Sequence, residues 1–166
     1  MADAAWYRNG LRFACARCGR CCGGGPGTIR ASDEEIAALA TGLGMGEAAF
    51  RKRYTRRLRA GDISLIEKDD NDCIFYDRKR GCTVYENRPR QCRTWPFWRA
   101  VVHSPENWAE EATDCPGMNF GLLHSSEEIA EMARDDGTSK SGRRRVAEKP
   151  KPMNSTPEQR SGIDHL

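Results

Sequence analysis

The pattern of polar and apolar residues after position 31 predicts a helix with a defined start. Ser32-Asp33-Glu34-Glu35 has the sequence of a capping box, in which the serine caps the first turn and the second glutamate reaches back to it. Ile36, Leu39 and Leu43 follow at intervals of three and four residues, which is helical spacing. Gly42 and Gly44 are typical of a helix end, so we expect these two residues to end the helix.

Two further helices are predicted by the same signals. Residues 47–60 place Phe50, Tyr54 and Leu58 on one face and six Arg or Lys residues on the other. The sequence Ser125-Ser126-Glu127-Glu128 is another capping box, and the apolar residues that follow it predict a last helix.

The strands are predicted to be short. Residues 63–68 are rich in strand-forming residues, and the segments 73–76 and 82–85 flank a polar turn over 77–81, which indicates a β-hairpin. The number of predicted helices and strands is low for a well-packed two-layer domain. The fold class we expect is a small α+β fold, an irregular, metal-stabilised arrangement of a few helices and a short β-hairpin.

Composition divides the chain at residue 136. All eight cysteines lie between Cys15 and Cys115, and only 38% of the chain is hydrophobic against 31% charged. A chain with a thin apolar core needs a further source of stability, and a bound metal ion or cluster is one of the few that proteins use. We therefore expect a cysteine-cluster metal-binding domain over 1–136. Residues 137–166 are rich in Ser, Pro, Gly, Lys and Arg, which predicts a disordered basic tail.

Charge and hydropathy argue against several classes of function. The tail carries a net charge of +4 and residues 1–136 carry −1, so the predicted domain lacks the basic excess typical of a nucleic-acid binder. No apolar run is long enough for a signal peptide or a membrane span. The expected location is therefore the cytoplasm. Thiols stay reduced there, so clustered cysteines indicate metal ligands or redox groups and not disulfides.

The strongest signal is the cysteine run near the N-terminus. Cys15, Cys18 and Cys21 are separated by two residues each, Cys22 follows directly, and Cys115 is a remote cysteine followed by proline. A C-x2-C-x2-C run completed by a remote Cys-Pro is the spacing of bacterial iron–sulfur sites. This pattern predicts thiolate ligation of a metal.

A second set comprises Cys73, Cys82 and Cys92. The first two lie on the predicted hairpin, where they can approach each other. One partition places Cys15, Cys18, Cys21 and Cys115 on one site and Cys22, Cys73, Cys82 and Cys92 on another; other partitions stay open. The second set contains no close cysteine pair of the kind that structural zinc uses, which favours an iron–sulfur cluster over zinc.

Arginines alternate with the cysteines and would offset the negative charge of a thiolate-held metal. Arg88 and Arg93 are the candidates for cofactor contacts, because guanidinium N–H groups near ligating sulfurs tune a cluster. Arg17 and Arg20 lie within the first run. Each of these arginines is equally well explained as solvated surface charge.

The cysteine pattern resembles the CxxCxxCC cysteine-cluster proteins, also called the YkgJ type, whose name is the motif of residues 15–22. The resemblance covers roughly residues 13–120 and runs through the following segments: Glu35-Ile36, Cys73, Gly81-Cys82-Thr83-Val84-Tyr85, Arg88-Pro89, Cys92-Arg93 and Pro96-Phe97. It implies a zinc- or iron-chelating domain, often assigned to oxidoreductases without a known substrate. The domain is also similar to the cysteine domain of flagellin N-methylases. No Gly-rich loop follows a predicted strand here, so methyl transfer is only weakly supported.

Three functions are consistent with these observations. The first is an iron–sulfur electron carrier or oxidoreductase, which would act with an unidentified protein or redox partner. The second is a zinc-stabilised structural or interaction module, and the third is a metal-handling protein. The sequence identifies no catalytic residue, substrate or oligomeric state.

Overall fold

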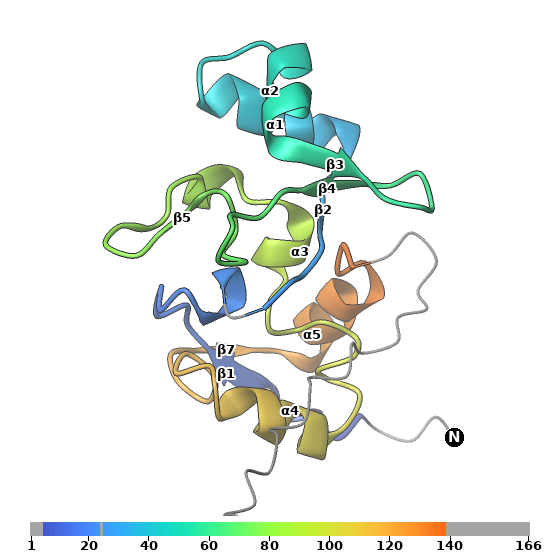
Figure 1. The fold of residues 1–166 in the computed structure, drawn as a ribbon. Helices are drawn as coiled ribbons and strands as arrows, with labels where there is room; N and C mark the ends of the chain where they lie inside the picture. The colour runs from blue at the N-terminus through green and yellow to red at the C-terminus, as the bar shows by residue number, and fades with distance from the viewer. Residues whose placement is uncertain (1–4, 24, 139–166) are drawn as a thin grey trace, which may run out of the picture.

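The computed structural model of the protein describes residues 5–23 and 25–138 (Figure 1). All but the first two residues of the predicted basic tail lie outside this range. Those two, Gly137 and Thr138, pack on the body: Thr138 is buried and its carbonyl accepts a hydrogen bond from the Arg30 guanidinium. In the described part of the chain, no helix combines the length and apolar character that crossing a membrane requires.

The fold is a small α+β structure, as predicted. Its helices are α1 (Asp33–Gly42), α2 (Glu47–Tyr54), α3 (Arg90–Arg93), α4 (Pro105–Ala112) and α5 (Ser126–Arg134), with 3₁₀-helices η1 (Arg20–Cys22) and η2 (Tyr85–Asn87). Its strands are β1 (Leu11–Phe13), β2 (Ile29–Arg30), β3 (Thr55–Arg57), β4 (Ile63–Leu65), β5 (Tyr76–Asp77), β6 (Gly81–Cys82) and β7 (Leu122–His124). They form three antiparallel sheets, with strand orders β1-β7, β2-β4-β3 and β5-β6.

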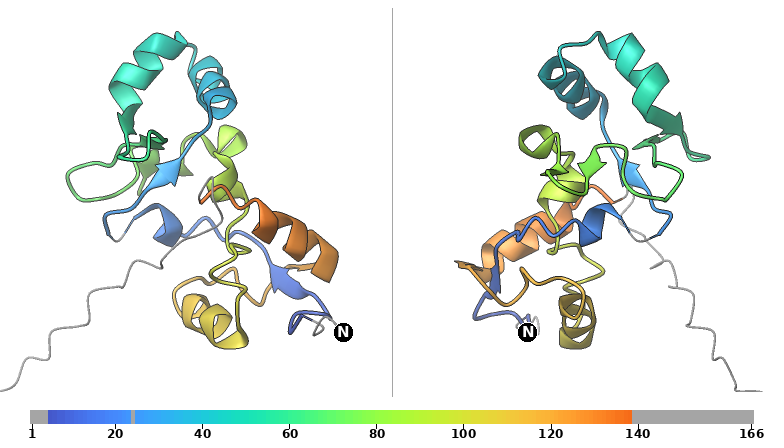
Figure 2. Two further views of the ribbon diagram at one scale, coloured as in Figure 1. Left: turned by 90° about the vertical axis from the view of Figure 1, so that its right-hand side faces the viewer. Right: turned by 60° about the vertical axis from the view of Figure 1, so that its left-hand side comes forward.

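Two separate hydrophobic cores hold the molecule together. The first lies beneath α1 and α2, which cover the β2-β4-β3 sheet at the top of Figure 1, and it includes the fully buried Ile36, Leu39 and Phe50. The second lies between α4, α5 and the β1-β7 pair and includes Phe97 and Ile129. Both views of Figure 2 show α1 and α2 at one end of the molecule and α4 at the other. The segment with η1 and α3 lies between them.

The predictions for the first and last helices are confirmed. Both capping boxes form: Ser32 accepts a hydrogen bond from the Glu35 amide in α1, and Ser125 accepts one from the Glu128 amide in α5. The helix α4 was not predicted, although Ser104 caps it and Pro105 occupies its first position, a combination that favours a helix start.

The predicted helix over 47–60 is wrong beyond Tyr54. From Thr55 the chain becomes strand β3, which pairs with β4 in register Thr55↔Leu65. The amide of Leu58 donates to the carbonyl of Asp62 and closes the turn between the two strands. Pairing with β4 satisfies these backbone groups between strands, and this tertiary contact outweighs the helical spacing of the side chains.

The predicted hairpin forms, but it is shorter than expected. Only Tyr76–Asp77 pair with Gly81–Cys82, so Cys82 lies on a strand opposite Tyr76. Cys73 lies before the hairpin and forms an isolated bridge with Glu67. The predicted strand over 63–68 is regular only over Ile63–Leu65.

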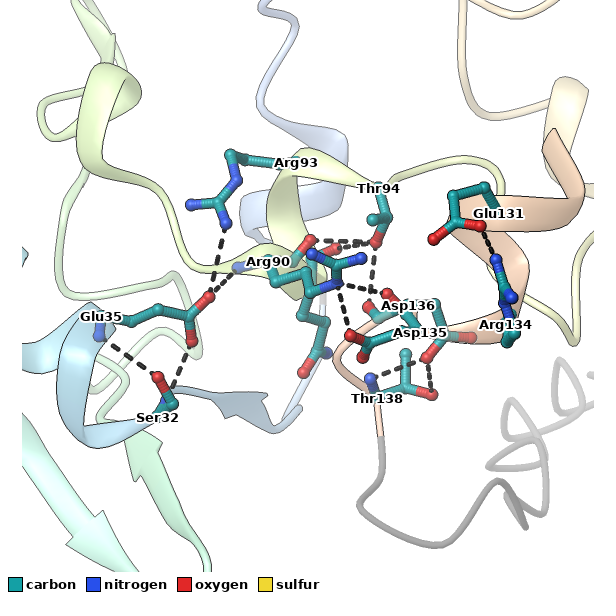
Figure 3. Close-up of polar contacts among 11 residues, drawn as sticks. Ser32, Glu35, Arg90, Arg93, Thr94, Glu131, Arg134, Asp135, Asp136 and Thr138 are labelled. Atoms are coloured by element: carbon teal, nitrogen blue, oxygen red, sulfur yellow. Dashed lines mark hydrogen bonds and ion pairs between the residues drawn. The ribbon is translucent and has the colours of Figure 1, made fainter. Parts of the chain in front are cut away.

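Glu35 connects the first core to the segment that carries Cys92 (Figure 3). One of its carboxylate oxygens accepts a hydrogen bond from the amide of Ser32, 2.9 Å away. The other accepts one from the amide of Arg90 at the start of α3, and lies 3.7 Å from the guanidinium of Arg93. A single carboxylate therefore caps α1 and fixes α3 beside it.

We expect Glu35→Ala to destabilise the protein by about 1–3 kcal/mol, because two backbone amides lose a charged acceptor. The measurement is urea unfolding followed by circular dichroism. Glu34→Ala is the matched control, since Glu34 is the exposed neighbour in the same helical turn and lacks these two contacts. Equal midpoints for the two variants would show that Glu35 does not connect α1 to α3.

Candidate metal centre

The eight cysteines line one cavity of about 820 Å³ between the two cores. They arrive from separate elements: Cys15 and Cys18 on the loop after β1, Cys21 and Cys22 in η1, Cys73 before β5, Cys82 in β6, Cys92 in α3 and Cys115 after α4. The structure thus brings together both sets of predicted ligands. None of the described residues that line the cavity is a histidine.

Backbone hydrogen bonds fix the cysteine run against the hairpin segment. The amide of Cys73 donates to the carbonyl of Cys22 over 2.6 Å, and the amide of Cys22 donates to the carbonyl of Gly19 over 2.9 Å. Gly19 has a left-handed backbone (φ 78°), and a Cβ there would lie 2.1 Å from the Tyr76 hydroxyl. Only glycine fits, so this position holds η1 close to the hairpin.

The cysteines differ in exposure. Cys73 is buried with 8% of its surface accessible, whereas Cys15, Cys18 and Cys21 are exposed. The first run therefore borders the opening of the cavity, and Cys73 lies at its inner wall.

The adjacent Cys21 and Cys22 thiols share a hydrogen bond, with their sulfurs 3.9 Å apart. This bond is the main reason why the pKa of Cys21 falls to about 7, and the nearby Arg88 guanidinium lowers it further. The same bond raises the pKa of Cys22, as do burial and the neighbouring Cys73 and Cys82. The shared hydrogen bond therefore favours the thiolate form at Cys21 and the protonated form at Cys22.

The inner thiols are stabilised in their protonated form. Burial raises the pKa of Cys73 to about 11, and it also raises the pKa of Cys82 and Cys92. Cys73, Cys82 and Cys21 each raise the pKa of Cys92. Mutual repulsion of this kind disfavours the charged form of these thiols, and a bound cation would relieve it.

These interactions link Cys21 to the second set of cysteines. It acts on Cys22, Cys73, Cys82 and Cys92, whereas the partition favoured from the sequence placed it with Cys15, Cys18 and Cys115. The partition stays a prediction. Within the described residues, no group of three or more His, Cys, Asp or Glu side chains is arranged to hold a metal ion.

Arg88 and Arg93 take different positions. Arg88 lines the cavity and lowers the pKa of Cys21, Cys82 and Cys92, although it is not the main influence on any of them. Arg93 pairs with Glu35 on the α1 side, as Figure 3 shows, and its guanidinium also donates to the carbonyl of Arg88. Arg88 thus acts on the cavity cysteines through its charge. Arg93 instead contacts Glu35 and the backbone of Arg88.

Two residues have roles at the site that the sequence analysis did not assign to them. Gln91, 3% exposed, accepts from the amide of Arg30 and donates to the carbonyl of Thr28, which ties β2 to the residue before Cys92. The Tyr85 ring lies against the guanidinium groups of Arg17 and Arg88. The buried side-chain amide of Gln91 belongs to no periodic pattern, so the sequence gives no sign of its role. The spacing of Arg88 three residues after Tyr85 could have indicated the contact between these two side chains.

Trp95 and Trp98 also line the cavity, with ring centroids 4.8 Å apart in an edge-to-face arrangement. The Trp98 indole donates to the carbonyl of Gln91. The sequence Arg93-Thr94-Trp95-Pro96-Phe97-Trp98 therefore supplies an aromatic wall next to Cys92, while Phe97 points into the second core.

Comparison with known proteins agrees with this site. The model of the CxxCxxCC family, described as "Putative zinc- or iron-chelating domain", matches residues 14–116 and so includes all eight cysteines. The uncharacterized protein MJ0661 of Methanocaldococcus jannaschii is 33% identical over 92 residues, which are 55% of this chain and 48% of that protein. The chain therefore spans about half the length of this relative. No solved structure matches. With its cysteine run, remote cysteines and shared cavity, the chain belongs to the CxxCxxCC family of zinc- or iron-chelating domains.

Proposed function

We propose that the cysteine cavity binds iron as a thiolate-held iron–sulfur centre, and that the protein is an electron carrier or a redox enzyme. The observation that carries this proposal is the convergence of all eight cysteines on one cavity between two cores. When bound, the centre would supply one-electron chemistry. The residues of this chain would hold it, offset its charge and control access to it.

The donor chemistry of the cavity fits such a centre. Thiolates are soft ligands that select zinc, copper(I) or iron–sulfur clusters over hard cations. Eight thiols exceed the four that one tetrahedral zinc ion takes. Arg88 beside Cys21 would compensate the negative charge of a thiolate-held centre.

Exposure of the first run supports a role in electron transfer or substrate access. Structural zinc sites are closed, with four protein ligands around the ion. Here Cys15, Cys18 and Cys21 are exposed, so a centre held by them would lie near the surface, within reach of a redox partner or a small molecule.

We expect anaerobically purified protein to contain iron and acid-labile sulfide and to absorb broadly in the visible range. In Cys18→Ser and in Cys92→Ser, the iron content falls by roughly half if the cysteines form two centres, and almost completely if they form one. The double variant loses nearly all iron in both cases. Iron, sulfide and zinc are measured per chain.

Ala16→Ser is the matched control, because Ala16 is exposed in the same run and lines the same cavity. It gains the same hydroxyl group without removing a thiol, and its iron content should equal that of the wild type. Zinc without sulfide or colour would refute the iron–sulfur centre and support a zinc-stabilised module. Weak, exchangeable metal at partial occupancy would instead support metal handling.

The raised thiol pKa values predict that pH has opposite effects on two quantities. As pH rises, the stability of the metal-free protein should fall and its affinity for metal should increase. An unfolded thiol has a pKa of about 8.5, whereas burial raises that of Cys73 to about 11 in the folded state. Between these values the folded state holds more protons than the unfolded state. Stability of the metal-free protein should therefore fall as pH rises from about 8.5, by roughly 1.4 kcal/mol per pH unit for each such thiol.

Metal binding displaces the same protons, so metal affinity should rise over this range. The measurement is urea unfolding of reduced, chelator-treated protein at pH 8.5 and 10, alongside metal titrations at both values. Cys73→Ala should reduce the pH slope of stability by one thiol's contribution, whatever its effect on the absolute value. A wild-type slope of zero would show that the inner thiols are not stabilised in their protonated form.

A further inference from the structure

Two guanidinium groups lie at one aromatic ring on the wall of the cysteine cavity. The central carbon of the Arg17 guanidinium is 4.0 Å from the centroid of the Tyr85 ring, and that of Arg88 is 3.5 Å from it. All three residues line the cavity. Arg17 comes from the first cysteine run and the other two from η2 and its end, so the fold brings together two distant segments.

Neither guanidinium has a carboxylate partner in residues 5–23 and 25–138. This distinguishes them from two other arginines of the same cavity wall. Arg20 pairs with Asp114 at 3.3 Å, and Arg78 pairs with Asp70 at 3.2 Å and with Asp72 at 3.5 Å. Within the described residues, two guanidinium groups without a carboxylate partner thus lie against one ring on the cavity wall.

Both guanidinium groups are held in place while their N–H donors remain available. Nε of Arg88 donates to the carbonyl of Tyr85 over 2.8 Å, which leaves its four terminal N–H groups. Arg17 has a left-handed backbone (φ 52°), which is uncommon for a residue with a side chain. A guanidinium that stacks on an aromatic ring can still use its N–H donors to bind a planar or tetrahedral oxyanion.

We propose that Arg17 and Arg88, positioned by Tyr85, form an oxyanion subsite of the cysteine cavity, which binds the carboxylate or phosphate group of a small molecule. The inference rests on the proposed function, since the rest of this molecule would lie toward the metal centre. The cavity volume of about 820 Å³ is within the range of about 300–1,000 Å³ found for small-molecule sites.

The test is isothermal titration calorimetry of the full-length protein with its native metal, using inorganic phosphate and succinate as separate probes at constant ionic strength. We expect at least one probe to bind, and Arg17→Gln to weaken its binding by about tenfold or more, because a charge-assisted pair of hydrogen bonds is lost. Arg20→Gln is the matched control in the same run. Its charge is already neutralised by Asp114, so binding should change by less than about twofold.

Metal and sulfide content are measured on the same samples, so failure of this subsite is distinguishable from failure of the metal centre. Unchanged metal with weakened binding in Arg17→Gln supports the subsite, and the probe that binds more tightly identifies phosphate or carboxylate as its ligand. The inference is wrong if neither probe binds the metal-loaded wild type. It is also wrong if Arg17→Gln and Arg20→Gln weaken binding equally, or if Arg17→Gln loses metal as completely as Cys92→Ser.

Discussion

The hydrogen bond from the amide of Cys73 to the carbonyl of Cys22 joins the two halves of the cysteine set. It holds the N-terminal run against the segment that precedes the hairpin, and Gly19 permits the close approach by leaving room for the Tyr76 hydroxyl. This contact brings together cysteines that are more than fifty residues apart in the sequence. Backbone pairing therefore helps to set the position of the candidate site.

The location of the cavity between two small cores gives a bound metal a structural consequence. One core lies under α1 and α2 and the other between α4 and α5, and cysteines pack on both: Cys22, Cys73 and Cys82 on the first, and Cys115 on the second. A metal held by both groups would connect the cores, so that part of its binding energy would become folding energy. Glu35 and Gln91 already make part of this connection without metal. Glu35 joins α1 to α3, and Gln91 joins β2 to α3.

Electrostatics divide the cavity into two zones. The inner zone contains buried thiols whose charge is disfavoured by burial and by one another, which is the condition that a cation relieves. The outer zone contains the exposed cysteines and the Arg17–Tyr85–Arg88 group. The proposed metal centre would occupy the inner region, and the proposed oxyanion would lie next to it in the outer region.

The sequence by itself determined the features that depend on residues close together in the chain. Helix starts at Ser32 and Ser125, the hairpin, the α+β class, the thiol chemistry and the family resemblance all rest on short-range patterns. Only the tertiary structure decided that residues 55–57 form a strand, that Gln91 bridges β2 and α3, that Cys21 acts on the second cysteine set, and that Arg17 and Arg88 share one ring. These features depend on contacts between residues far apart in the chain, and such contacts leave no local periodicity because they are set by how the elements pack.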